Sequence, residues 1–127
     1  MDSKQYLKDS ARTAFSDYNK IAERMTLEGA TIDLQHAAMG MVTESAEFTD
    51  ALKKSIFYGK PLDKVNLREE LGDILWYVAL ALRTLDTDFE TVMVRNIEKL
   101  KARYPQNFTE ENAITRDLET ERKILEK

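Results

Sequence analysis

The sequence contains no cysteine, one histidine, four glycines and two prolines among its 127 residues. The lack of cysteine excludes a disulfide scaffold, a zinc–thiolate site and a cysteine nucleophile. A single histidine argues against a Ser-His-Asp triad and against histidine-rich metal sites. No apolar run approaches the roughly 18–20 residues of a spanning helix, so we expect no membrane partner. The scarcity of glycine and proline favours long helices over many short strands.

The charge balance is mildly acidic, with 19 Lys and Arg against 23 Asp and Glu and a net charge of −4. This balance argues against a general nucleic-acid-binding surface, so we expect no nucleic-acid partner. The length suits one compact domain with a real apolar core. Residues 1–4 lead directly into an amphipathic pattern without a signal peptide, so we expect a cytoplasmic protein.

Apolar residues recur at steps of three and four in four long segments, which predicts an all-α protein with a four-helix bundle-type core. The predicted helices cover about residues 3–25, 31–57, 63–85 and 87–104. Their start and stop signals are, in chain order, Gly29, Gly59 with Pro61, Asp63, a Thr87–Glu90 capping box and Pro105. We predict one domain over residues 1–108. A polar C-terminal tail follows over 109–127, as a weak helix in an oligomer contact or as a solvated end.

The second predicted helix buries most of its circumference and leaves one strip that carries carboxylates. Glu44 and Glu47 lie on this strip, where Gly40 and Ala51 leave space that a merely solvated face would not need. The residues within about a third of the circumference are His36, Gly40, Thr43, Glu44, Glu47 and Ala51.

The third predicted helix repeats this arrangement on a stripe that spans about 60°. The stripe consists of Asn66, Glu70, Asp73 and Tyr77, with Glu69 to one side. If the two helices pair as an antiparallel hairpin, four or five carboxylates converge on one cleft.

Converging carboxylates are unfavourable alone, because like charges in a poorly solvated site raise one another's pKa. Divalent cations relieve this repulsion, and oxygen ligands favour Mg²⁺, or Mn²⁺ in its place, over Zn²⁺. Because Mg²⁺ usually binds a few carboxylates together with substrate phosphates, a nucleotide polyphosphate is the expected ligand. The alternative is a solvated acidic face. A di-iron bundle would need Glu-x-x-His on two helices, which one histidine cannot supply.

The fourth predicted helix carries a basic face near its end, where Asn96, Lys99 and Arg103 step by three and four residues. Two interpretations stay open for the cations. They complement the helix dipole, or they hold outer phosphates and neutralise a leaving pyrophosphate. No Gly-x-x-x-x-Gly-Lys loop is present, so the chain is not a P-loop enzyme.

Three segments together resemble the MazG family of all-α nucleoside triphosphate pyrophosphohydrolases, over about residues 36–104. The segments are Thr-Glu-Ser-Ala-Glu at 43–47, Glu-Glu-Leu-Gly-Asp-Ile-Leu-Trp-Tyr at 69–77 and Asn-Ile-Glu-Lys-Leu-Lys-Ala-Arg-Tyr-Pro at 96–105. The family signature is Glu-Glu-x-x-Glu, a spacer and Glu-x-x-Asp. Thr43 replaces its first glutamate, and since a hydroxyl adds no charge, we expect metals to be held differently or more weakly.

The resemblance implies Mg²⁺-dependent hydrolysis of (deoxy)nucleoside triphosphates between the α and β phosphates, giving a nucleoside monophosphate and pyrophosphate. We predict Glu47 as the residue that polarises the attacking water and Glu69 as its acidic assistant. The other predicted site residues are the metal ligands Glu44, Glu47, Glu70 and Asp73, the phosphate ligands Lys99 and Arg103, and the substrate contacts His36, Asn66, Tyr77 and Asn96.

The resemblance also implies a homo-oligomer, either a homodimer or a homotetramer built from dimers. The residues agree, because apolar side chains nearly encircle the second predicted helix and Trp76 lies near the edge of the acidic stripe. Two alternatives remain open. One is a dUTPase-like or phosphoribosyl-ATP-cleaving enzyme of the same superfamily, and the other is a non-catalytic helical dimerisation module.

Overall fold

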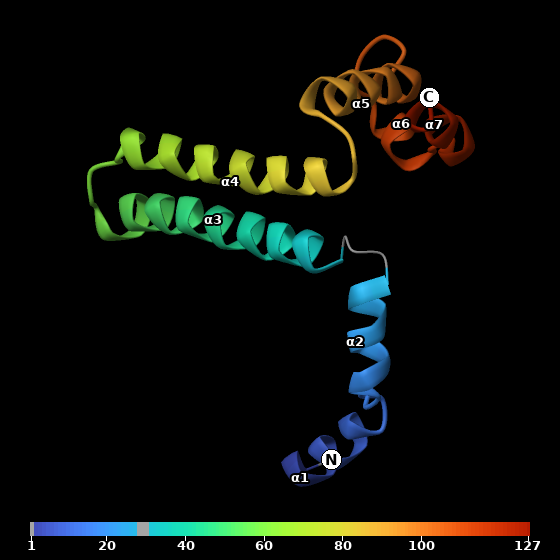
Figure 1. Cartoon of the computed structure of the whole chain (residues 1–127). Helices are drawn as coiled ribbons and strands as arrows, with labels where there is room; N and C mark the ends of the chain where they lie inside the picture. Colours follow the sequence, from blue (N-terminus) through green and yellow to red (C-terminus); the bar gives the residue numbers. More distant parts are fainter. Residues whose placement is uncertain (1, 28–30) are drawn as a thin grey trace.

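The computed structural model describes residues 2–27 and 31–127, and its regular elements there are helices (Figure 1). In chain order they are α1 Ser3–Ala11, α2 Tyr18–Leu27, α3 Thr31–Tyr58, α4 Lys64–Thr84, α5 Phe89–Arg103, α6 Glu110–Ile114 and α7 Leu118–Leu125. The predicted all-α class is confirmed. None of the helices in this described part combines the length and the apolar character that crossing a membrane requires.

The first predicted helix, over residues 3–25, is wrong in one respect, because the structure has two helices there. Asp17 begins the second one, since its carboxylate accepts the backbone N–H of Lys20 at 3.0 Å. This cap lies inside a run whose apolar spacing continues, so periodicity alone does not detect it. The predicted break at Gly29 lies outside the described residues.

Helices α3 and α4 form an antiparallel hairpin whose turn matches the predicted signals. Gly59 adopts a left-handed φ of +66°, and the N–H of Lys60 donates to the carbonyl of Lys54 at 3.2 Å. This bond reaches one residue further back than the six-to-one bond of a Schellman cap, and with the left-handed glycine it closes the end of α3. Asp63 then caps α4 by accepting the N–H groups of Val65 and Asn66 at 2.9 and 3.1 Å.

Facing positions step in opposite directions along the two helices of the hairpin. Near one end the ring of Tyr77 covers the backbone of Gly40, where a Cβ atom would overlap it. Near the turn, Ala51 of α3 and Asn66 of α4 line the same pocket. The two helices therefore lie side by side between these two points, and the acidic stripes occupy this stretch.

Helix α5 packs against α7 at the other end of the chain. Its N-cap is Asp88, which accepts the N–H of Thr91 at 2.7 Å, so the prediction that Thr87 opens this helix is wrong by one residue. The helix ends before Pro105, as predicted. The polar tail contains α6 and α7, and α7 turns back onto α5.

The helices pack mainly as pairs rather than around one enclosed centre. Among the described residues, Ala37 and Leu82 are the buried apolar side chains. The chain exposes 10593 Å², whereas a compact monomer of its 14.7 kDa would expose about 6,900 Å². Figure 1 shows both outer groups at the end of the hairpin opposite its turn, with α1 and α2 on the α3 side and α5, α6 and α7 on the α4 side. Much apolar surface is consequently left without a partner inside one chain.

Candidate active site

Three carboxylates meet between α3 and α4. Glu44 and Glu47 come from α3 and Glu70 from α4, and one oxygen of each lies within 4.8 Å of the others. Their exposure is graded, because Glu70 is only 4% exposed, Glu44 is half-buried and Glu47 is exposed. The structure thus brings together three of the four predicted metal ligands.

Glu70 is held by one polar neighbour and opposed by several. The Asn66 amide nitrogen donates to its carboxylate at 2.6 Å from one turn earlier on α4. Burial raises the pKa of Glu70, the hydrogen bond from Asn66 acts in the opposite sense, and the negative charges of Glu47, Glu44 and Glu69 raise it further. The ionised cluster therefore favours an added positive charge.

The donor set fits a hard divalent cation. The cluster offers carboxylate oxygens, which suit Mg²⁺, Mn²⁺ or Ca²⁺, and its members include neither the histidine nor a thiolate that zinc sites favour. The near-complete burial of Glu70 beside two further carboxylates also matches a site that a cation completes. Glu44, Glu47 and Glu70 are thus the residues that could hold a metal.

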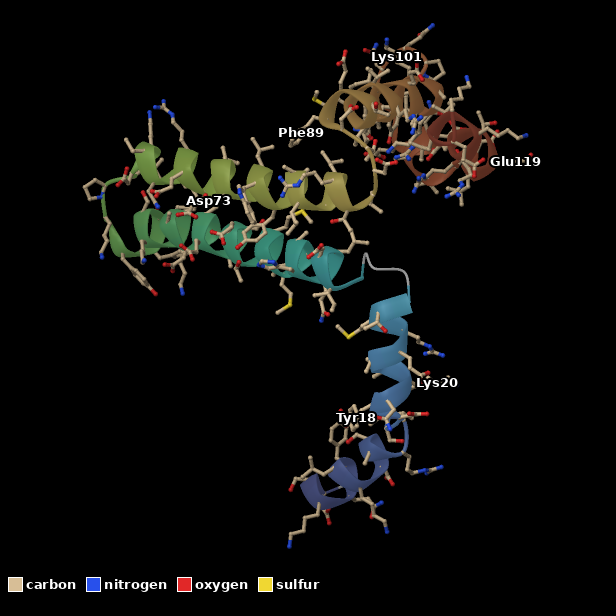
Figure 2. The ribbon with its side chains drawn as sticks, viewed as in Figure 1. Tyr18, Lys20, Asp73, Phe89, Lys101 and Glu119 are labelled. Atoms are coloured by element: carbon tan, nitrogen blue, oxygen red, sulfur yellow. The ribbon has the colours of Figure 1, made fainter. Side chains whose placement is uncertain are left out.

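The remaining acidic residues of the stripe lie next to this cluster. Asp73 is exposed on α4, one turn beyond Glu70, and is labelled in Figure 2 along the hairpin. It does not belong to the set of three mutually close oxygens. Glu69 is exposed and acts on Glu70 through its charge. The roles of Asp73 as a ligand and of Glu69 as an assisting acid stay predictions.

Thr43 occupies the place of the missing glutamate of the signature. Its hydroxyl oxygen lies 3.1 Å from a carboxylate oxygen of Glu44 and 2.9 Å from the carbonyl of Gly40. A hydroxyl proton shared between these acceptors steadies Glu44 without adding a negative charge. Thr43 therefore gives the cluster one negative charge fewer than a glutamate would, while it keeps a polar contact there.

An aromatic group lies along the hairpin on one side of the cluster. Tyr77 is edge-on to His36 at 5.6 Å and to Trp76 at 5.0 Å between ring centroids. The structure therefore places the predicted substrate contacts His36 and Tyr77 together. Asn66 lies on the opposite side of the cluster, where its amide already binds Glu70.

The predicted basic face of α5 is not brought to the carboxylates within one chain. Lys99 donates to the side-chain oxygen of Asn96 at 2.7 Å. Arg103 forms a two-pronged ion pair with Glu121 of α7, at 2.8 Å from Nε and 2.6 Å from Nη2. The guanidinium that we predicted to bind phosphates is thus paired with a carboxylate of the tail, whose two oxygens match its planar N–H donors. The phosphate roles of Lys99 and Arg103 stay predictions.

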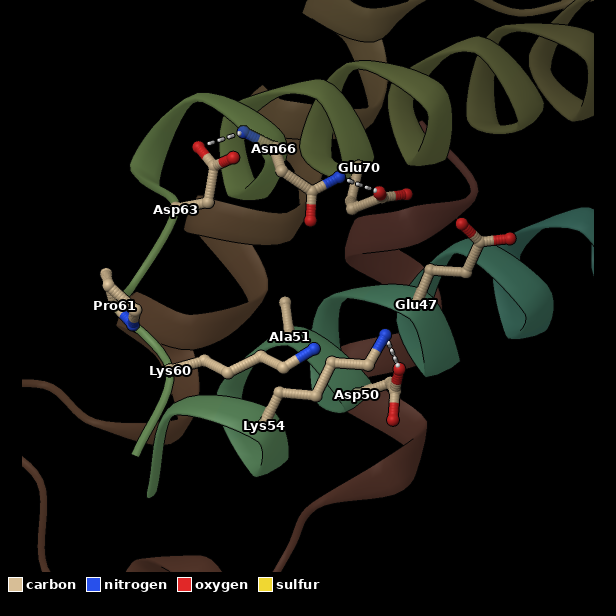
Figure 3. A pocket seen from close by; sticks show the side chains of 9 residues that line it. All are labelled: Glu47, Asp50, Ala51, Lys54, Lys60, Pro61, Asp63, Asn66 and Glu70. Carbon is tan, nitrogen blue, oxygen red and sulfur yellow. Dashed lines mark hydrogen bonds and ion pairs between the residues drawn. The ribbon is translucent and has the colours of Figure 1, made fainter. Parts of the chain in front are cut away.

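A pocket of about 390 Å³ adjoins the cluster where α3 turns into α4 (Figure 3). Glu47 and Glu70 belong to its wall, so the pocket and the cluster are continuous. Lys54 and Lys60 add positive charge to it. Sequence reasoning missed these two lysines, although Lys60 stands inside the stop signal between Gly59 and Pro61.

Comparison with known proteins assigns the hairpin to a family. The model of the MazG nucleotide pyrophosphohydrolase domain matches residues 33–108, more than half of the chain. The chain belongs to the MazG family. This confirms the predicted resemblance, and a MazG domain supports nucleotide pyrophosphohydrolase activity in general. The MazG match includes the carboxylate cluster, the adjoining pocket and the whole of α5.

One relative has a phage origin. The gene 37 protein of Mycobacterium phage L5 is 36% identical to this MazG chain over 77 residues. The alignment covers 55% of this chain and 65% of the phage protein, so the chain spans just under two thirds of that relative. No solved structure matches the chain. MazG proteins typically depend on a divalent metal, which agrees with the oxygen donors of the cluster.

Proposed function

We propose that this MazG protein hydrolyses (deoxy)nucleoside triphosphates between the α and β phosphates and releases a nucleoside monophosphate and pyrophosphate. The observation that carries the proposal is the meeting of Glu44, Glu47 and Glu70, with one oxygen of each within 4.8 Å of the others. Two helices thereby present a concentrated negative charge beside an open pocket. Such a site suits Mg²⁺ together with the phosphates of a nucleotide.

The graded exposure of the carboxylates suggests their division of labour. Glu44 and Glu70, joined by Asp73, hold Mg²⁺, which supplies positive charge against the phosphate oxygens when bound. Glu47 is the exposed member of the cluster and accepts the proton of the attacking water. The water oxygen bonds to phosphorus as the phosphoanhydride bond breaks, and the bond's electron pair leaves with pyrophosphate. Glu69 assists by keeping the neighbourhood negative.

The nucleoside end of the substrate lies at the aromatic group in this proposal. Tyr77 is fixed because its ring covers Gly40, so it offers His36 and an incoming base a rigid neighbour. Aromatic rings stack on bases without reading them strongly. The site therefore accepts several bases and discriminates among them through pocket shape.

The proposal extends to a homo-oligomer, as a dimer or a dimer of dimers. One chain exposes about 3,700 Å² more than a compact monomer of its mass, well above the roughly 800 Å² that each partner buries in a standard interface. Leu71, Leu75 and Trp76 of α4 are exposed along this hairpin. A second copy that covers them would also supply the missing half of a bundle core and a place from which α5 could reach a site.

Pyrophosphate release tests the reaction. Ribo- and deoxynucleoside triphosphates are each incubated with Mg²⁺, Mn²⁺ or EDTA, and pyrophosphate, phosphate and monophosphate are quantified. We expect metal-dependent release of pyrophosphate, its loss in Glu70→Gln and its retention in Glu119→Gln, a matched change on the exposed face of α7. Release of phosphate would mean that a different bond breaks. A protein that neither turns over nor binds metal would favour the non-catalytic module.

The oligomer has its own test in sedimentation velocity at micromolar protein concentration. We expect a species of two or four chains, and weaker association in Leu75→Glu. A stable monomer of 14.7 kDa would contradict the oligomer and would leave the exposed apolar surface without an occupant.

A further inference from the structure

The pocket at the hairpin turn is a built feature rather than a gap between flexible chains. Its volume of about 390 Å³ lies within the roughly 300–1,000 Å³ of small-molecule sites. Three elements line it: the end of α3, the connection after Gly59 and the start of α4. Figure 3 shows Lys54 and Lys60 reaching inward from two of these elements.

The turn geometry fixes the two lysines relative to each other. The N–H of Lys60 is bonded to the carbonyl of Lys54, and the left-handed Gly59 makes this bond possible. Pro61 follows directly and restricts the backbone further. The two ammonium groups therefore start from backbone positions that are set before any ligand arrives.

The carboxylates at the turn end of the pocket are already engaged. Asp50 binds the Lys54 ammonium at 2.5 Å, and Asp63 accepts two N–H groups at the start of α4. Among the described residues, no carboxylate lies within 4.0 Å of the Lys60 ammonium. Lys60 is thus a free positive charge, and Lys54 becomes a second one when an anion competes with Asp50.

The order of groups along the hairpin matches the order of groups in a nucleoside triphosphate. The aromatic group at Gly40 and Tyr77 comes first, the carboxylates around Glu47 second and the lysine pocket third. On α3 these groups are marked by Gly40, Glu47 and Lys54, and each is seven residues, or about 10 Å of helical rise, from the next. A nucleotide with its α–β bond at the carboxylates directs its outer phosphates toward Lys54 and Lys60.

We propose that this pocket binds the β and γ phosphates of the substrate, and then the pyrophosphate product, through Lys60 and Lys54. The inference rests on the proposed function for the identity of the substrate. Lys54 and Lys60 are not among the phosphate ligands predicted from the family motif, which are Lys99 and Arg103 of α5. Ammonium groups bind phosphates as point charges, so they suit a leaving group whose oxygens rearrange.

Calorimetric titration of the full chain with inorganic pyrophosphate, and separately with a nucleoside monophosphate, tests this pocket at fixed Mg²⁺. We expect Lys60→Gln to weaken pyrophosphate binding about tenfold, the size of a lost bond to a charged group, and to leave monophosphate binding unchanged. Lys53→Gln is the matched control, because Lys53 is one residue from Lys54 on the same helix but faces the Tyr58 ring, outside the pocket.

Asp50→Asn adds a test of opposite sign. The change releases Lys54 from its partner, so we expect pyrophosphate binding to tighten about twofold to fivefold, as for a partly exposed ion pair. A variant that merely damaged the fold would not bind more tightly. The pocket assignment would be overturned if Lys60→Gln weakened the binding of pyrophosphate and of the monophosphate equally. It would also be overturned if neither Lys60→Gln nor Asp50→Asn changed pyrophosphate binding.

The binding data also separate this inference from the proposed reaction. A wild type that shows the expected pyrophosphate effects but releases none from any triphosphate would overturn the reaction and leave the pocket. If the wild type releases pyrophosphate, and Lys60→Gln binds pyrophosphate as well as the wild type does, the reaction stands and the pocket assignment is overturned.

Discussion

Two buried glutamates in this chain have opposite surroundings. Glu121 of α7 is 5% exposed and binds the guanidinium groups of Arg103 and Arg116, each at 2.6 Å. The hydrogen bond from Arg103 and then that from Arg116 lower the pKa of Glu121 to about 2. Glu70 of α4 is 4% exposed and has one neutral amide donor beside further carboxylates. Burial raises its pKa.

This difference separates a structural charge from a functional one. A buried carboxylate that is fully paired inside the chain ties elements together, as Glu121 ties α7 to α5. A buried carboxylate left among like charges destabilises the fold unless something outside the chain completes it. Burial is the same in both cases, so the sign of the neighbours is what identifies the candidate active site.

Glu70→Gln has the largest expected effect on this comparison. Removing the buried ligand should lower metal-dependent turnover at least about 100-fold, since even outer partners of metal ligands are worth 10–100-fold. The metal-free variant should melt at the same temperature as the wild type or higher, because one repelled charge is gone. Mg²⁺ should raise the melting temperature of the wild type more than that of the variant. A variant with wild-type turnover would contradict the site.

Glu121→Gln should have the reverse profile, with lower stability and retained turnover per folded molecule. The folded pKa lies near 2 and the ordinary value is 4.5, so the ion pair stabilises the fold above about pH 4.5. That stability is lost as pH falls from 4.5 toward 2, because the unfolded chain binds the proton first. Denaturant unfolding at stepped pH should show this slope in the wild type and a shallower one in the variant. Equal slopes would show that the two arginines do not hold Glu121.

Gly40→Ala tests the close approach of the hairpin helices at the aromatic end. The added Cβ would overlap the Tyr77 ring, so either the ring or α3 must move. Overpacking of this kind costs about 1–3 kcal/mol. Urea unfolding should show the loss, and Gly72→Ala on α4 is the matched control, because nothing lies within 4 Å of a Cβ atom added there. If Gly40→Ala proves no less stable than the wild type, Tyr77 does not rest on that backbone.

The hairpin is the part that the sequence predicts well, and the reason is local. Gly59, Pro61 and Asp63 act within a few residues of their own positions, and carboxylate spacing on a helix fixes which face they share. The pairing of Arg103 with Glu121 depends on how the segment between α5 and α7, which includes α6, folds back. Residue spacing does not predict this. Lys60 lies inside the predicted turn, but the turn signals do not say that this turn closes onto Lys54 and lines one pocket with both lysines. Asp17 shows that even a local cap is missed when apolar periodicity runs through it.

Lys123→Ala has the smallest expected effect and isolates what makes Glu121 different. Lys123 binds Glu119 at 2.6 Å, the distance that also joins Arg103 to Glu121. The side chains of Lys123 and Glu119 are nevertheless 69% and 80% exposed. Water screens such a pair, so we expect a change in unfolding free energy of about 0–0.5 kcal/mol and unchanged turnover. Parallel urea titrations with Glu121→Gln provide the measurement. Equal losses in the two variants would mean that distance alone sets the strength of these pairs, whereas a loss confined to Glu121→Gln assigns it to the burial of Glu121 and to its pairing with two arginines.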